Sequence, residues 1–152
     1  MKISVMGIEY NHLLSGKALA EMGNEVVYIS KDNKRIDNIK RGYYNADEAM
    51  VIKNIDKENE VRFSADIKEA LSKSNMCFIS EGMNSENNVH DEVLKTAKEI
   101  GEHMSSHMFI IDRSEASMSR IEEIKETIQE ELAKRNTNIT FEVIANPNFL
   151  RL

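Results

Sequence analysis

Short apolar runs of strand length alternate along this chain with longer segments whose apolar residues recur at helical spacing. The apolar runs predict strands at 2–6, 25–29, 76–79, 108–111 and 140–145, with a shorter one at 61–63. Helical spacing predicts helices at 12–22, 32–40, 45–54, 66–73, 88–103 and 117–134. Strands that alternate with helices in this way are typical of a mostly parallel sheet that is covered on both faces.

This alternation predicts the fold class. Right-handed crossovers between parallel strands build an α/β, Rossmann-like, doubly wound sheet, here of about six strands with helices on both faces. No repeat, low-complexity tract or linker interrupts the pattern, and 152 residues suit one compact unit. We therefore expect residues 1–152 to form a single domain.

The first predicted turn departs from the pattern that a dinucleotide-binding unit normally carries. Such a unit reads G-x-G-x-x-G between its first strand and first helix, so that a pyrophosphate meets bare backbone at the helix N-terminus. The corresponding segment here is Gly7-Ile8-Glu9-Tyr10-Asn11-His12. Glu9 and His12 therefore stand at the second and third glycine positions.

Glu9 has two interpretations. As a ligand-site residue it would fill the space of the pyrophosphate and repel it, because two unit charges about 4 Å apart repel by roughly 4 kcal/mol at an effective dielectric near 20. That repulsion would weaken binding by about three decades. Alternatively, the Glu9 carboxylate caps the helix N-terminus. His12 is interpreted either as an anion or metal contact or as a partly exposed side chain on a slightly displaced helix.

Composition narrows the function classes. A net charge of −6 argues against nucleic-acid and anionic-membrane binding, and no apolar stretch approaches the roughly 18–20 residues that span a bilayer. The only cysteine, Cys77, lies in an apolar run and is expected to be a buried small hydrophobe. The chain starts directly with a strand pattern and has no signal-peptide pattern, so a cytoplasmic location is expected.

Many positions along the chain match one known family. They are MKISVMG at the start, Leu13, Ser15-Gly16, Leu19-Ala20-Glu21, Gly23, Glu25-Val26-Val27, Arg62-Phe63, Asp66, Lys68-Glu69-Ala70, Phe78-Ile79, Gly82 and the ending 145–151. The sequence resembles the N-terminal, NAD-binding domain of the UDP-glucose/GDP-mannose dehydrogenases, which oxidise nucleotide sugars to uronic acids. The resemblance covers nearly the whole chain. It implies NAD as the cofactor, bound around Gly7, Tyr10, Asn11 and Gly82.

The departures from the family pattern fall on the ligand site. Ser30 replaces the acidic residue that holds the adenosine ribose, and basic residues at Lys31, Lys34 and Arg35 follow it. In this fold, such a change accommodates the 2′-phosphate of NADP. NADP is the less favoured alternative, because Glu9 opposes any dinucleotide.

Three further loops depart from the family. The family's VGTP becomes Glu81-Gly82-Met83-Asn84, and its K-S-T motif has Glu115 in place of the threonine that is thought to help position catalytic water. The family ending NPEFLREG has Asn148 and Leu152 at its two glutamate positions. None of these replaced positions is expected to be catalytic, although Met83 and Glu115 still belong to the expected ligand site.

The resemblance also implies what the chain lacks. The family's nucleophilic cysteine, lysine and asparagine lie in later domains, so this chain alone is expected not to oxidise UDP-glucose. Either those missing domains or a homodimer would cover the apolar end at 149–152. Three hypotheses follow: the cofactor domain of a nucleotide-sugar dehydrogenase, a binding or interaction module for another small molecule, and an altered scaffold.

Two further groups of side chains are candidates for other ligand sites. His90, His103 and His107 lack the cysteines or carboxylates at zinc-site spacing, so no metal site is predicted. Glu9, Glu81 and Glu115 are expected near the carboxyl ends of strands, where they would form an acidic mouth that either holds a cationic ligand or is simply solvated.

Overall fold

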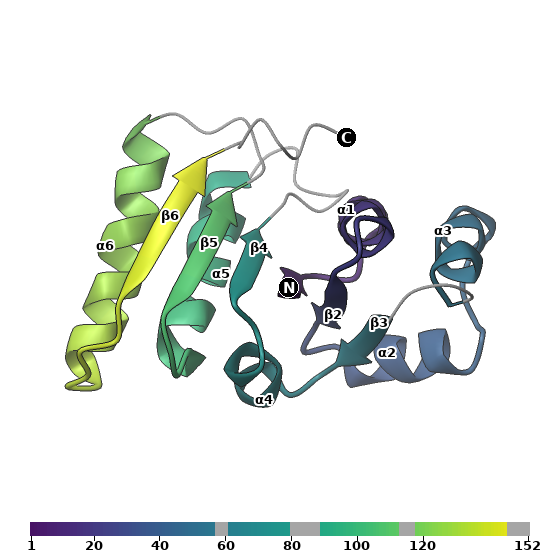
Figure 1. The fold of residues 1–152 in the computed structure, drawn as a ribbon, viewed down its shortest axis with the longest axis horizontal. Helices are drawn as coiled ribbons and strands as arrows, with labels where there is room; N and C mark the ends of the chain where they lie inside the picture. The colour runs from purple at the N-terminus through teal and green to yellow at the C-terminus, as the bar shows by residue number, and fades with distance from the viewer. Residues whose placement is uncertain (57–60, 80–88, 113–117, 146–152) are drawn as a thin grey trace.

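The computed structural model describes residues 1–56, 61–79, 89–112 and 118–145. They form one six-stranded sheet in the order β3-β2-β1-β4-β5-β6, and every adjacent pair of strands is parallel (Figure 1). The order reverses at β1, from which the chain proceeds first to β2 and β3 and later to β4 on the other side. A Rossmann-like, doubly wound α/β fold was the prediction, and it is confirmed.

The strands lie where the apolar runs predicted them, within a residue at each end. Their bounds are β1 Lys2–Met6, β2 Glu25–Ile29, β3 Val61–Ser64, β4 Met76–Ile79, β5 Met108–Asp112 and β6 Phe141–Ala145. The short strand expected at 61–63 is therefore an edge of the sheet, paired with β2.

The helices also agree with the predicted segments. They are α1 Tyr10–Glu21, α2 Asn33–Lys40, α3 Ala46–Asp56, α4 Ile67–Ser72, α5 Val89–His103 and α6 Met118–Lys134. Two ends differ by two residues: α3 ends later than expected, and α1 begins earlier than expected, because Glu9 serves as its N-cap. The consequence is that the whole β1–α1 turn contains only three residues, Gly7 to Glu9.

Two apolar clusters hold the layers together, one on each face of the sheet. Alternate residues of each strand point to opposite faces, so Val26 and Tyr28 belong to one cluster while Val27 and Ile29 belong to the other. Helices α1, α2 and α3 cover the first face, and α4, α5 and α6 cover the second. Cys77 lies inside the second cluster, fully buried as expected.

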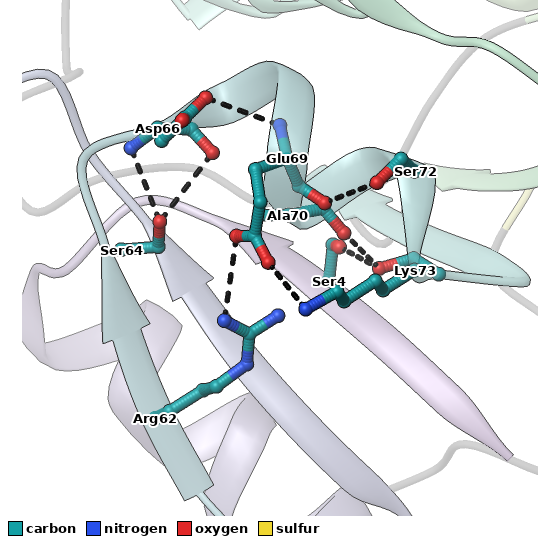
Figure 2. A network of polar contacts seen from close by, with 9 residues as sticks. Ser4, Arg62, Ser64, Asp66, Glu69, Ala70, Ser72 and Lys73 are labelled. Carbon is teal, nitrogen blue, oxygen red and sulfur yellow. Dashed lines mark hydrogen bonds and ion pairs between the residues drawn. The ribbon is translucent and has the colours of Figure 1, made fainter.

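A polar network fixes the short helix α4 against β3 (Figure 2). Asp66 caps the helix by accepting the N–H of Glu69 at 3.1 Å, and the Ser64 hydroxyl accepts the N–H of Asp66 at 3.1 Å. The Glu69 carboxylate in turn contacts Lys73 at 2.8 Å and Arg62 at 3.4 Å. These contacts begin α4 immediately after β3 and bring its first residue, Ile67, to the carboxyl edge of the sheet.

Tyr28 anchors α1 to β2. Its hydroxyl donates to the carbonyl of Leu13 at 2.8 Å, and its ring stacks on Phe63 with the centroids 5.0 Å apart. A Cβ on Gly16 would lie 2.1 Å from the Tyr28 hydroxyl, so only glycine permits α1 to lie this close to the sheet. Burial raises the pKa of Tyr28, which therefore stays a neutral donor.

Candidate functional site

A cavity of about 620 Å³ opens at the carboxyl ends of β1 and β2, where the strand order reverses. Open α/β sheets bind their ligands at this edge. Seven of the residues expected at the cofactor site line the cavity: Gly7, Glu9, Tyr10, His12, Ser30, Lys31 and Arg35. The structure thus brings together residues from the β1–α1 turn and the β2–α2 turn.

Gly7 makes the tight turn that carries the chain from β1 into α1. Its φ of 133° lies in the region that favours glycine, and its N–H donates to the carbonyl of Ile29 at 2.8 Å. A Cβ built on Gly7 would lie 2.3 Å from the imidazole ring of His12. The ring of His12 therefore lies directly over the turn.

His12 is buried, with 5% of its surface exposed. The interpretation of His12 as a partly exposed side chain was therefore wrong. The ring turns back over Gly7, and its Nδ1 accepts the backbone N–H of Glu9 at 3.1 Å. Because Nδ1 acts as the acceptor, a neutral ring carries its proton on Nε2.

Glu9 is the N-cap of α1, with an extended backbone at φ −80° and ψ 169°. Glu9 and His12 form a capping box, in which each side chain approaches the backbone N–H of the other residue. This arrangement agrees with the capping interpretation of Glu9. The N–H groups of Glu9 and His12, at the helix end that this fold normally offers to a pyrophosphate, are thus directed at side chains of the chain itself.

The two basic residues of the cavity are both held by carboxylates. Lys31 Nζ lies 2.8 Å from Glu99 on α5, and the hydrogen bond to Glu99 is the main cause that raises the pKa of Lys31. Arg35 pairs with Glu48 of α3 and also donates to the carbonyl of Ile8 at 3.3 Å. Each of the two cations is therefore already in an ion pair with a carboxylate, with which a 2′-phosphate would have to compete.

The remaining residues near the turn have mainly structural contacts. Ser30 lies at the end of β2, and its hydroxyl accepts the N–H of Asp32 at 3.1 Å. Tyr10 is half-buried against the cluster under α1, whereas Asn11 is exposed and its carbonyl accepts the Ser15 hydroxyl at 3.0 Å. Asn11 is not one of the described residues that line the cavity.

Several acidic residues of the cavity were not expected from the sequence. They are Asp32, the N-cap residue of α2, Asp47 and Glu48 of α3, and Glu92 and Glu99 of α5. A signal was present for two of them, since Asp32 precedes a helical segment and the Asn45-x-x-Glu48 spacing is typical of a capping box. The positions of Glu92 and Glu99 depend on how α5 crosses the sheet, which the local pattern does not contain.

A buried ion pair lies at the carboxyl end of β5. Arg120 donates from Nε and Nη2 to the two carboxylate oxygens of Asp112, each at 3.0 Å, and Asp112 is completely buried. The fork of two parallel bonds joins the end of β5 to the start of α6. No feature of the sequence pattern singled out this pair.

Several expected site residues lie outside the described residues. They are Glu81, Gly82, Met83, Glu115, Asn148 and Leu152. Within the described ranges, no group of three or more His, Cys, Asp or Glu side chains is arranged to hold a metal ion. Across the same ranges, no helix combines the length and the apolarity required to cross a bilayer.

The fold, the position of the cavity and the glycine turn define a dinucleotide-binding type of domain. Residues 1–152 match the family described as "UDP-glucose/GDP-mannose dehydrogenase family, NAD binding domain". The chain belongs to this family, and the resemblance of its sequence is confirmed over its full length.

Named relatives support the same assignment. The chain is 29% identical over 156 residues to UDP-glucose 6-dehydrogenase TuaD of Bacillus subtilis and 27% identical over 158 residues to UDP-glucose 6-dehydrogenase of Pseudomonas aeruginosa. Each alignment covers 99% of this chain but only 33% and 35% of the relative. The chain thus spans about a third of the length of the curated relatives that it matches.

Solved structures show the same fold. A GDP-mannose dehydrogenase from Pseudomonas aeruginosa aligns with a TM-score of 0.74 at 24% identity, over 99% of this chain and 37% of that one. A UDP-glucose dehydrogenase from the archaeon Pyrobaculum islandicum aligns with a TM-score of 0.75 at 19% identity, over 99% and 36%. At these identities, the likeness establishes the fold of this chain.

Proposed function

We propose that this domain keeps the family's dinucleotide-binding fold but binds NAD weakly, because its own side chains fill the pyrophosphate turn. The observation that carries the proposal is the hydrogen bond of 3.1 Å from the Glu9 N–H to His12 Nδ1, with the His12 ring over Gly7. A family whose matching domain is described as NAD-binding would be expected to leave this turn open.

Three effects combine against a pyrophosphate at this turn. The His12 ring occupies the space above Gly7, which backbone glycines leave free in a working fingerprint. The capping box engages N–H donors of the first helical turn, so a phosphate would have to displace a buried ring to reach them. The Glu9 carboxylate adds a like charge. The residues present therefore do not fit the cofactor that the family implies.

NADP is disfavoured for the same reason and for a second one. Lys31 and Arg35 are engaged by Glu99 and Glu48, and a 2′-phosphate would have to compete with both carboxylates. We accordingly infer no NADP preference from the basic residues that follow Ser30.

We also propose that this chain alone does not oxidise UDP-glucose. Its only cysteine, Cys77, is fully buried in the middle of the sheet, and burial strongly raises the pKa of its thiol. A thiol in that state is neither accessible nor ionised, so it cannot serve as a nucleophile. The matched relatives are about three times as long, and the family resemblance implies that the nucleophilic cysteine lies in later domains.

Calorimetric titration with NAD tests the proposal. We expect the wild-type chain to bind NAD more weakly than roughly 100 μM, and the Glu9→Gly/His12→Gly variant to bind at least about tenfold more tightly. Ala18→Gly, which places a glycine elsewhere in α1 and leaves the capping box intact, is the matched control and should not change the affinity. Wild-type affinity tighter than that value would contradict the proposal.

A negative result with the double variant has a defined meaning as well. If circular dichroism shows that the variant is folded and NAD binding does not improve, the capping box is not the cause of weak binding. The replaced acid at Ser30 would then be the stronger explanation. NAD reduction by the purified wild-type chain with UDP-glucose, above a control without protein, would contradict the proposed lack of activity.

The second candidate function is a binding module for another small molecule. The specific observation in its favour is that the cavity is lined by six carboxylates and only two cations. Such a module would be a cytoplasmic protein, either monomeric or joined to a partner chain. It would use the same cavity for a ligand less negatively charged than NAD.

A further inference from the structure

The cavity at the ends of β1 and β2 combines the volume of a small-molecule pocket with apolar wall and oxygens that can accept hydrogen bonds from ligand hydroxyls. Its volume of about 620 Å³ lies within the range of roughly 300–1,000 Å³ that is usual for small-molecule pockets. Met6, Ile29 and Ile67, all buried, provide apolar wall. Ser30 and Asp32 provide oxygens that can accept hydrogen bonds from ligand hydroxyls.

The helix N-termini that face the cavity are already capped from within the chain. At α2, Asp32 accepts the N–H of Arg35 at 3.0 Å. At α3, the side-chain oxygen of Asn45 accepts the N–H of Glu48 at 2.8 Å. Together with the Glu9–His12 box at α1, each cap takes up part of the N–H donors that make a helix N-terminus attractive to phosphate.

The charge balance opposes phosphate as well. Six carboxylates line the cavity against two cations, a formal excess of four negative charges. Both cations are paired, Lys31 with Glu99 and Arg35 with Glu48. The field inside the cavity therefore repels an anion and attracts a cation.

We propose that this cavity has the opposite charge selectivity to a dinucleotide site: it binds nucleosides without a phosphate, and it prefers a positive charge at the 5′ end. This inference rests on the proposed function, since it concerns the same site and assumes that the pyrophosphate turn is filled. Its ligand class is a nucleoside whose 5′ group is neutral or cationic. The preferred order is 5′-ammonium, then 5′-hydroxyl, then 5′-phosphate.

Three probes that differ only at the 5′ carbon test this order: 5′-amino-5′-deoxyadenosine, adenosine and AMP. At about 50 mM NaCl and neutral pH, we expect each step in the order to weaken binding by about threefold to fivefold. Raising the salt to about 500 mM should bring the three dissociation constants together, because the Debye length falls well below the width of the cavity. This comparison uses only the wild-type chain.

A variant then tests the cause. Glu99→Gln removes a carboxylate and releases Lys31, so the ratio of the AMP and adenosine dissociation constants should fall by about threefold. Glu126→Gln is the control of equal charge change. Its exposed side chain belongs to α6, at the opposite end of the sheet from β2 (Figure 1), and the ratio should stay unchanged.

Binding of AMP as tight as that of adenosine, or tighter, would overturn the proposal. So would the absence of binding by all three probes at about 5 mM. Either outcome can occur while NAD binding stays weak, in which case the proposed function stands and only the charge selectivity fails. Tight NAD binding would contradict the proposed function whatever the order of the three probes.

Discussion

Replacing Gly7 by alanine tests whether the His12 ring truly lies over the β1–α1 turn. The substitution has two separable costs. At φ 133°, an alanine backbone is strained by about 1–3 kcal/mol. The new Cβ would also lie 2.3 Å from the His12 ring, which can move only by giving up its burial and its bond to the Glu9 N–H. That overpacking adds about 1–3 kcal/mol.

The free energy of unfolding should therefore fall by about 2–6 kcal/mol in the wild-type background. In a His12→Ala background, the ring is absent and only the strain remains, so Gly7→Ala should cost about 1–3 kcal/mol there. Urea unfolding followed by far-UV circular dichroism gives both differences, provided that the slope of the transition stays constant. Their difference is the coupling energy between positions 7 and 12.

Equal costs in the two backgrounds would refute the reasoning. A coupling energy below about 0.5 kcal/mol is what independent sites show, and it would mean that the ring is not above the turn. A Gly7→Ala cost below about 1 kcal/mol in the wild-type background would also contradict the backbone geometry.

Three further perturbations have defined outcomes. Tyr28→Phe removes the donor to the Leu13 carbonyl and should lower the free energy of unfolding by about 1–3 kcal/mol in urea. Arg120→Met removes both hydrogen bonds from Arg120 to the buried Asp112 carboxylate and should lower the free energy of unfolding by about 3–5 kcal/mol. Adding Asp112→Leu removes the buried charge and should restore much of that stability, measured by thermal unfolding. The hydrogen bond from Lys73, together with Arg62, lowers the pKa of Glu69. The ionised Glu69 carboxylate therefore stabilises the fold above its unfolded-state pKa, and this contribution is lost as the pH falls through its lower folded-state pKa. Glu69→Gln should flatten the fall in the free energy of unfolding over that pH range.

The elements of the fold could be predicted because each apolar run and each helical stripe is a local signal. The strands and helices lie within two residues of their predicted bounds at every end. The early start of α1 is one of the two differences of that size, and its cause is local as well. Glu9 is the N-cap, as one of its two interpretations held, and His12 three residues later completes a capping box that differs from the usual pairing of serine or threonine with glutamate or glutamine.

The site was predicted less completely than the fold. The residues of the two turns could be named, because the turns follow directly from strand ends. Glu92 and Glu99 could not, since their place in the cavity depends on the tertiary path of α5. The burial of His12 was also missed, because a polar residue in a first helical turn is usually solvated and only the glycine at position 7 leaves room for its ring.

The central claim is that the Glu9–His12 box fills the position where the family binds pyrophosphate. Nuclear magnetic resonance of the wild-type chain tests it most directly, through the His12 ring nitrogens and the backbone amide of Glu9. We predict a neutral ring with its proton on Nε2, and an amide signal of Glu9 that shows no saturable shift with ADP below roughly 100 μM. A ring protonated on Nδ1, or a shift of the Glu9 amide that saturates below that ADP concentration, would contradict the claim.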